Sequence, residues 1–328
     1  MDEFDVIRDL SKSLPAAPPE VIVPIGDDCA VLRLGGTSWV AAADMLVSGH
    51  HFDDWATPED VGYKAVAVNV SDVAAMGGRP RFVLVSGGAP DPETVLRCMR
   101  GVTEACEEFG VYQLGGDTTR AGSLTVDVSI LGELPGPPML RSGARPGDLL
   151  AVTGELGASA VGLLILQRDE RIPERLVRKH LRPEPRVEVG IAAARLGVHA
   201  AIDLSDGLAS DARRVCERSG VGCWVDLDCL PIADDTRRLI EYFAYAPETL
   251  AATGGEDYEL LLAAPEQTLE ALAGESGAPV TVVGEVTREG VVFLRGENPV
   301  EGLSGWDHFP SPASPGTTSP PFNRRKEQ

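Results

Sequence analysis

Strand-like runs recur along the first half of the chain. Residues 38–44 are apolar and end on Asp44, and residues 81–87 form a second such run. Residues 111–115 lead into the motif GGDTT, and residues 123–133 alternate between apolar and polar, which is typical of a strand with one wet face. These runs predict a sheet, with several polar side chains delivered to the points where its strands end.

Two helices are predicted between these strands. Thr57 and Pro58 are typical of a helix start, and the glycine pair 77–78 is typical of its end. On this helix, Lys64, Asn69 and Asp72 share a polar stripe, so each needs a partner if it is buried. A second helix is expected over 92–109. Its predicted apolar face consists of Leu96, Met99, Val102, Cys106 and Phe109.

Prolines at 135, 137 and 138 interrupt the pattern and predict a boundary between two domains, 1–136 and 137–310. Beyond them, strands are expected at 148–153, 200–204, 222–227, 258–264, 280–287 and 290–295. Helices are expected at 157–168, within 173–197, and at 206–219, 233–244 and 266–275. The order mixes helices with strands of antiparallel character, which predicts the α+β class. The Pro- and Ser-rich tail, 311–328, is predicted to be disordered.

Composition narrows the classes of function. The 328 residues include 29 Lys and Arg against 50 Asp and Glu, so the net charge of −21 argues against a nucleic-acid partner. The acidic N-terminus does not resemble a signal peptide, and no apolar run is long enough to span a membrane. The six cysteines form no CxxC pair and no zinc-like spacing, which predicts reduced thiols. We therefore expect a cytoplasmic protein without a membrane partner.

Seven aspartates stand out because they occur in short motifs flanked by Gly or Ser. They are Asp27, Asp28, Asp44, Asp72, Asp117, Asp203 and Asp206. Each could simply form a turn, and Asp203 or Ser205 could cap the helix that begins near Asp206. If the seven converge, divalent cations and a cation-bridged polyphosphate are needed to hold so much negative charge together. That predicts Mg²⁺-dependent phosphoryl transfer, although the chain has no Walker motif and no protein-kinase signature.

Other candidates are weaker when taken one at a time. His51 belongs to a histidine pair that could be surface or catalytic, and Trp306 could pack in the core or cover an aromatic ligand. Arg141 could bind a phosphate or simply be solvated. The motif GGEDYELL repeats the form of GGDTT, with a glycine pair before Glu256 and Asp257.

In this order the motifs IGDDCAVL, DMLVSGHHF, NVSDVAAMGG, LGGDTTR, RSGARPGD, DLSDGLASD and GGEDYELL resemble those of thiamine-monophosphate kinases, within the aminoimidazole ribonucleotide synthetase-like superfamily. The resemblance implies a two-domain subunit, a homodimer formed through the N-terminal sheets, and ATP-dependent phosphorylation of thiamine monophosphate to thiamine diphosphate. It places several Mg²⁺ ions on the seven aspartates. It further implies ATP binding by Gly116, Asp117, Arg141 and Ser205, and substrate binding by His51, Asp257 and Trp306.

One departure from the family concerns Ala42 and Ala43, which stand where the family often has Ser and Thr, so hydroxyl ligation is impossible there. The expected mechanism is in-line transfer to an acceptor phosphate that is already largely ionised, so no general base is predicted. Two alternatives stay open. One is another ATP-using enzyme of the superfamily, such as a purine-pathway or selenophosphate synthetase. The other is a non-enzymatic protein that binds divalent cations.

Overall fold

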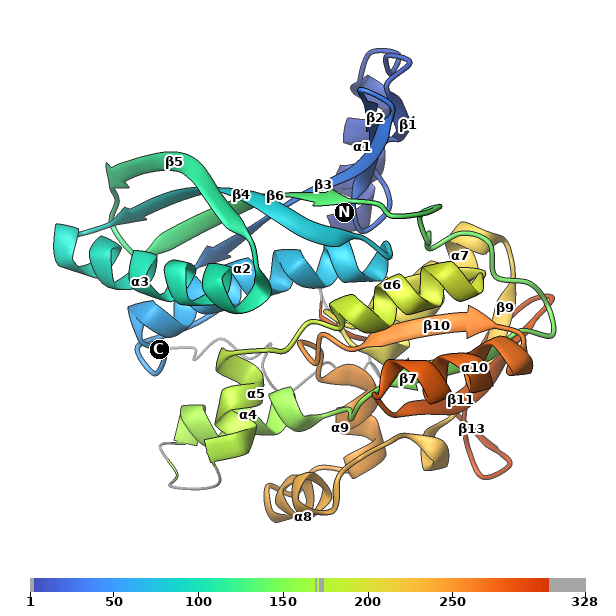
Figure 1. Ribbon diagram of the computed structural model, residues 1–328. Helices are drawn as coiled ribbons and strands as arrows, with labels where there is room; N and C mark the ends of the chain where they lie inside the picture. Colours follow the sequence, from blue (N-terminus) through green and yellow to red (C-terminus); the bar gives the residue numbers. More distant parts are fainter. Residues whose placement is uncertain (1–2, 169, 171–173, 307–328) are drawn as a thin grey trace.

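The computed structural model describes residues 3–168, 170 and 174–306. Its elements gather around two sheets, at the upper left and lower right of Figure 1, and helices pack against both. This mixture of helices with mainly antiparallel strands confirms the predicted α+β class. Among the described residues, no helix is both long enough and apolar enough to cross a bilayer.

The first sheet has six strands in the order β1-β2-β3-β6-β4-β5. They are β1 (Val21–Val23), β2 (Ala30–Leu34), β3 (Thr37–Val47), β4 (Arg79–Ala89), β5 (Tyr112–Arg120) and β6 (Thr125–Glu133). Strands β4 and β5 run parallel because a helix connects them, whereas the other neighbours are antiparallel.

Helices α2 (Pro58–Ala75) and α3 (Pro92–Phe109) cover one face of this sheet (Figure 1). The Thr57 hydroxyl accepts a hydrogen bond from the backbone N–H of Asp60 at 3.2 Å, which confirms the predicted N-cap. Glycine allows the two helices to approach closely, since a Cβ at Gly101 would lie 1.8 Å from the Glu59 carbonyl oxygen. The buried face of α3 differs from the prediction, because Val95 and Cys98 are buried while Leu96 is 55% exposed.

The second sheet has seven strands in the order β13-β12-β9-β11-β7-β10-β8. They are β7 (Leu149–Thr153), β8 (Ala200–Asp203), β9 (Gly222–Asp226), β10 (Leu260–Ala264), β11 (Val280–Thr287), β12 (Val291–Arg295) and β13 (Asn298–Val300). Strands β7, β8 and β10 are almost wholly buried. Because both faces of these strands are buried, their sequences are continuous apolar runs rather than alternating apolar and polar residues.

The second half of the chain also contains helices. They are α4 (Ala158–Arg168), α5 (Glu174–Leu181), α6 (Val187–Leu196), α7 (Leu208–Ser219), α8 (Asp234–Tyr242), α9 (Pro247–Thr253) and α10 (Glu266–Ser276), with a 3₁₀ turn at Leu227–Cys229. Helices α6 and α10 share one apolar cluster with β8 and β10. Helices α7 and α9 belong to a second cluster, which includes the buried strand β9. An N-terminal helix, α1 (Glu3–Ser13), is drawn at the top of Figure 1, in the same region of the view as β1 and β2.

The two halves are joined through α2. A Cβ at Gly190 would lie 2.0 Å from the Ala74 carbonyl oxygen, so α6 contacts α2 at backbone distance. The Ser71 hydroxyl donates to the Asp203 carboxylate at 2.6 Å, which ties α2 to the end of β8. The Nε of Arg182 donates to Oδ1 of Asp60 in α2 at 2.8 Å, which adds a second link between the halves. This junction fixes where the ends of β3, α2 and β8 meet.

Most of the expected strands and helices are present, with differences of a few residues at their ends. The motif GGDTT is an exception, because it lies inside β5 rather than after it. The sequence did not predict α1, β1, β2, β13 or the short helix α9. All six cysteines are free thiols, as predicted. The domain boundary after residue 136 stays a prediction, and the expected disordered tail lies outside the described residues.

Candidate active site

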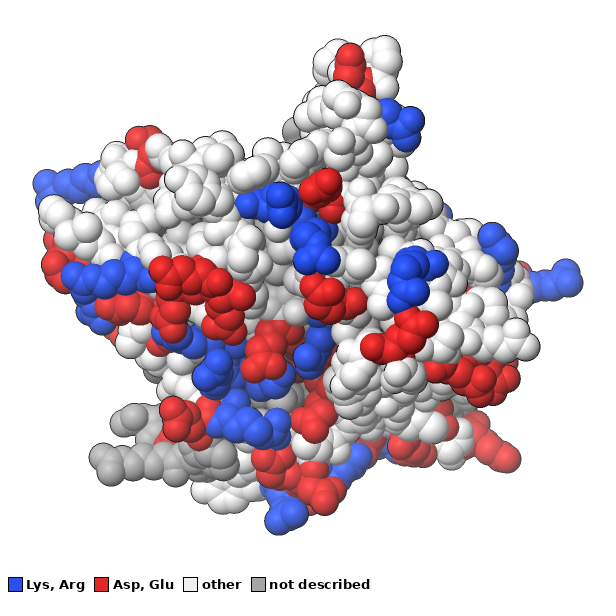
Figure 2. All heavy atoms as spheres, viewed as in Figure 1, with Lys and Arg blue, Asp and Glu red and all other residues white. Residues whose placement is uncertain are grey.

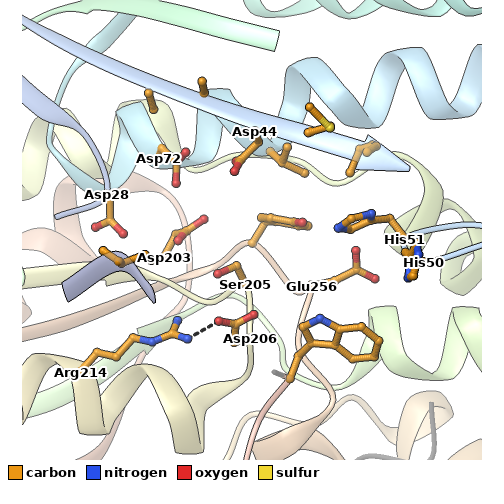
Figure 3. Close-up of a pocket in the computed structure, with 18 of the residues that line it drawn as sticks. Asp28, Asp44, His50, His51, Asp72, Asp203, Ser205, Asp206, Arg214 and Glu256 are labelled. Atoms are coloured by element: carbon orange, nitrogen blue, oxygen red, sulfur yellow. Dashed lines mark hydrogen bonds and ion pairs between the residues drawn. The ribbon is translucent and has the colours of Figure 1, made fainter. Parts of the chain in front are cut away.

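A cavity of about 1850 Å³ lies at the junction of the two halves. Six of the seven predicted aspartates line it: Asp27, Asp28, Asp44, Asp72, Asp203 and Asp206. Figure 3 shows Asp28, Asp44, Asp72 and Asp203 directed toward one shared space. Carboxylates remote in sequence therefore converge, as the aspartate motifs predicted.

Each carboxylate is delivered by a different element. Asp28 follows the turn after β1, and Asp44 lies in β3. Asp72 occupies the last turn of α2, and Asp203 is the final residue of β8. Because α2 packs on the inner face of the first sheet and also contacts β8, these four positions are brought together by the fold itself.

The tightest group consists of Asp28, Asp72 and Asp203, each of which offers an oxygen within 4.8 Å of the others. Asp28 and Asp203 are buried, and Asp72 is partly buried. Carboxylate oxygens at such separations fit a hard divalent cation such as Mg²⁺. Three carboxylates so close together repel one another, and Arg141 pairs with only one of them, so the donor set itself favours a metal.

The electrostatics of the cluster support the same conclusion. Burial, reinforced by Asp28, raises the pKa of Asp27 to about 6. Burial also raises the pKa of Asp72, and Asp44 and Asp203 add to the shift by repulsion. The Asp203 pKa is raised by burial and by Asp28. Carboxyl groups that resist ionisation in this way gain most when a cation binds them.

Arg141 reaches the cluster from the segment that links the two halves. Its Nη2 lies 2.5 Å and its Nε 3.0 Å from Asp28 Oδ1. Its backbone N–H donates to Asp27 Oδ1 at 3.0 Å. The alternative of a merely solvated arginine is therefore wrong, because the guanidinium is directed into the cavity and paired with an aspartate.

Ser205 and Asp206 also line the cavity, at the start of α7. The residue that precedes α7 is Gly207, and no side chain caps this helix. The expectation that Asp203 or Ser205 caps it is thus wrong. Asp203 instead accepts the Ser71 hydroxyl, and Asp206 pairs with Arg214.

Gly116 and Asp117 are not among the residues that line the cavity. Ser86 pairs with Asp117 in the parallel ladder, and Leu84 with Gly115. Leu84 is exposed, whereas its neighbours Val83 and Val85 are buried against the helices. Side chains alternate along a strand, so Asp117 lies on the outer face of the sheet. Within one chain it is separated from the other six aspartates.

The cavity is also lined by His50, His51 and Trp306, and Figure 3 shows the two histidines at the end away from the carboxylate cluster. The backbone N–H of Val47 donates to His51 Nδ1 at 3.0 Å, so the proton of the neutral imidazole is on Nε2. Figure 3 shows His51 and Glu256 near each other, away from the carboxylate cluster. His51 and Trp306 thus line the same cavity as the aspartates, and their contact with substrate stays a prediction.

Asp257 does not line this cavity, and its neighbour Glu256 does. Asp257 accepts from the backbone N–H groups of Gly157 at 2.8 Å and Ser159 at 3.3 Å, at the start of α4. Glu256 is ion-paired with the buried Lys64 at 2.7 Å. Although burial opposes ionisation, Lys64 lowers the pKa of Glu256. The predicted contact of Asp257 with substrate is therefore not supported by its position.

Two functional candidates, Asp211 and Arg214, were missed by the sequence, and Glu256 was noted in its motif without a role. Glu256 has a left-handed backbone with φ of 56°, which interrupts the alternation expected before β10. Asp211 and Arg214 lie three residues apart in α7. Residues at this spacing share one face of a helix, so the spacing could have indicated that they pair. Ala42 and Ala43 do line the cavity, so their lack of hydroxyl groups affects its wall directly.

The chain is similar to known proteins along most of its length. Residues 26–134 match the model for the AIR synthase related protein N-terminal domain, and residues 145–297 match the C-terminal one. Thiamine-monophosphate kinase of Escherichia coli K12 is 39% identical, over 94% of this chain and 99% of its own length. The Bacillus subtilis 168 enzyme is 36% identical, over 94% of this chain and 100% of its own.

Solved structures of related proteins also resemble this chain in fold. The structure of AaThiL complexed with AMPPCP and TMP aligns with a TM-score of 0.83 and 33% identity, covering 94% of this chain and 97% of that one. A hydrogenase maturation protein, HypE, shares the fold at 21% identity and a TM-score of 0.71. The chain belongs to the thiamine-monophosphate kinase family of AIR synthase related proteins.

Proposed function

We propose that this protein transfers the γ-phosphoryl group of ATP to thiamine monophosphate and so forms thiamine diphosphate. The observation that carries the proposal is the carboxylate cluster in a cavity that His51 and Trp306 also line, with His51 at the end away from the cluster. A cavity of about 1850 Å³ has room for two phosphorylated ligands. The relatives that share nearly the whole chain are thiamine-monophosphate kinases.

The aspartates fit Mg²⁺, which when bound would supply charge neutralisation between two polyanions. Asp28, Asp72 and Asp203 would hold it, with Asp27, Asp44 and Asp206 around them. Arg141 and Ser205 line the same wall and would bind phosphate oxygens of ATP. The role of these residues is alignment of the two phosphates for in-line transfer.

The acceptor is a phosphate monoester whose second pKa is about 6, so at neutral pH it is already mostly a dianion. No residue is required to remove a proton, and the Nε2–H of His51 would instead donate a hydrogen bond to a phosphate oxygen of the acceptor. Trp306 would stack on the aromatic part of thiamine monophosphate. Glu256, rather than Asp257, is the carboxylate positioned to accept a hydrogen bond from that part.

The outer face of the first sheet supports a homodimer. Met45, Leu84, Tyr112 and Leu114 are between 48% and 69% exposed. In Figure 2 the surface over β4 and β5, at the upper left, carries few charged side chains. An apolar sheet face of this kind is typical of a subunit interface. Since Asp117 lies on this face, Gly116 and Asp117 would complete the ATP site of the partner subunit.

The test is whether ATP is consumed only when both Mg²⁺ and thiamine monophosphate are present. Asp72→Asn should reduce kcat at least a hundredfold, because it removes a central carboxylate of the cluster. Asp91→Asn is the matched control, since Asp91 caps α3 outside the cavity and asparagine caps equally well. Turnover with a different phosphorylated acceptor would favour another enzyme of the superfamily, and metal binding without any turnover would favour a non-enzymatic role.

A further inference from the structure

Arg214 lies on α7 at the wall of the cavity, and its side chain is only 12% exposed. Its guanidinium pairs with Asp206, as the dashed line in Figure 3 marks. It also donates from Nη1 to Asp211 Oδ1 at 2.8 Å. Arg214 therefore pairs both with Asp206, which lines the cavity, and with Asp211, which does not.

Asp211 has a different environment from the predicted metal ligands. Its side chain is completely buried, and it is not among the residues that line the cavity. Its Oδ2 has no hydrogen-bond partner within the described part of the chain. Asp211 and Arg214 are three residues apart on one helix, so α7 itself fixes their pairing. A buried carboxylate that cannot reach a ligand is suited to hold the arginine in place.

We propose that Arg214 is a phosphate-binding residue of this site and that Asp211 is the positioning residue that directs its guanidinium into the cavity. A guanidinium has five N–H donors in a rigid fork. Asp206 pairs with part of this fork and Asp211 with another part. If Asp206 served as a ligand of a cation, Asp211 would keep the guanidinium at the wall, where it would donate to phosphate oxygens.

The inference rests on the proposed function only in requiring a phosphorylated ligand in the cavity. Two such ligands are expected, and both offer the same oxygens. Binding of each is therefore measured separately by calorimetry in the presence of Mg²⁺, with a non-hydrolysable ATP analogue or with thiamine monophosphate. A third titration, with Mg²⁺ alone, reports on the carboxylates without any phosphate.

Arg214→Met alone would leave Asp211 as an unpaired buried carboxylate and could unfold the protein. The informative variant is therefore Asp211→Asn combined with Arg214→Met, which removes both buried charges. Arg213→Met is the matched control. Arg213 lies on the same helix, does not line the cavity, and packs over Phe293 with its guanidinium carbon 4.9 Å from the ring centroid.

The double variant should bind one of the two phosphate ligands roughly tenfold or more weakly, because charge-assisted hydrogen bonds are lost. Its affinity for Mg²⁺ alone should not fall, since Asp206 no longer has a competing arginine. The Arg213 variant should match the parent protein in all three titrations. The ligand whose affinity falls identifies the phosphate that Arg214 binds.

Unchanged affinity of the double variant for both phosphate ligands would overturn the inference, and Arg214 would then only neutralise buried carboxylates. This outcome is distinct from failure of the proposed function. If the parent protein binds the ATP analogue but does not phosphorylate thiamine monophosphate, the proposed acceptor is wrong, while the role of Arg214 is still decided by the nucleotide titration.

Discussion

Glu256 and Asp257 are neighbours in the chain with opposite surroundings. Glu256 lines the cavity and is paired with the buried Lys64, whose Nζ lies 2.7 Å from Oε1. His180 stays neutral beside this pair, because burial and then Lys64 lower its pKa to about 3. Asp257 is directed away, toward the first amides of α4. The first carboxylate is placed for binding and the second for stability.

Glu256→Gln is expected to raise the KM for thiamine monophosphate severalfold and to leave the KM for ATP unchanged, since the loss affects only the end of the cavity near His51. The Lys64→Met/Glu256→Gln double variant controls for the unpaired lysine. Asp257→Ala should instead lower the free energy of unfolding by about 1 kcal/mol, as loss of a helix cap does. Steady-state kinetics and urea unfolding check both, and a KM effect confined to Asp257→Ala would reverse the assignment.

The aspartate motifs predicted that the carboxylates converge, and the family resemblance added Arg141, Ser205, His51 and Trp306. Six of the aspartates and these four residues line one cavity. Neither the motifs nor the resemblance could predict the side-chain directions that decide between Glu256 and Asp257. That choice depends on left-handed backbone at Glu256 and Tyr258, with φ of 56° and 50°. Such conformations are unusual for residues other than glycine, and tertiary contacts rather than local preference hold them.

At the scale of elements, helix and strand periods predicted the secondary structure well because most elements are long or strongly apolar. These periods failed to predict strands that form only because a neighbouring strand pairs with them. Strand β1 has three residues and forms only by pairing with β2. The GGDTT segment resembles a loop in composition, yet β4 provides a parallel partner and makes it strand. Glycine and aspartate have weak strand preference, so only the tertiary context could decide.

The contact between α2 and α3 gives a test of this packing. Gly101→Ala should destabilise the protein by several kcal/mol, because its Cβ would lie 1.8 Å from the Glu59 carbonyl oxygen and the helices would have to separate. Gly274→Ala in α10 is the matched control, since no heavy atom lies within 4 Å of its Cβ. It should stabilise by about 0.5–1 kcal/mol through helix preference. Equal effects of the two substitutions in thermal unfolding would refute the close contact.

At the scale of the whole molecule, the acidic cluster links stability to pH and metal. In the metal-free protein the Asp27 pKa is about 6, above its ordinary 3.8, so the folded state binds more protons than the unfolded state between these values. Stability without metal should therefore fall as pH rises from 3.8 to about 6, and Asp203, whose pKa is also raised, adds to the trend. Mg²⁺ binds the ionised carboxylates, so the increase in Tm that it causes should grow with pH. A metal-induced Tm shift that is independent of pH would argue against these ligands.

The assembly can be tested by mixing two inactive variants. Asp72 lies in the cavity, whereas Asp117 lies on the outer face of the sheet that we propose binds a second copy. If each site uses Asp72 from one subunit and Asp117 from its partner, a heterodimer of Asp72→Asn and Asp117→Asn subunits contains one intact site. Mixing and refolding the two should restore about a quarter of the parent activity, since half of the dimers are mixed and each has one of two sites intact. A single-chain site would leave every site damaged, and activity would then stay at the level of the separate variants. The Leu114→Glu substitution, which places a charge on the same face, should prevent both dimer formation in sedimentation and recovery on mixing.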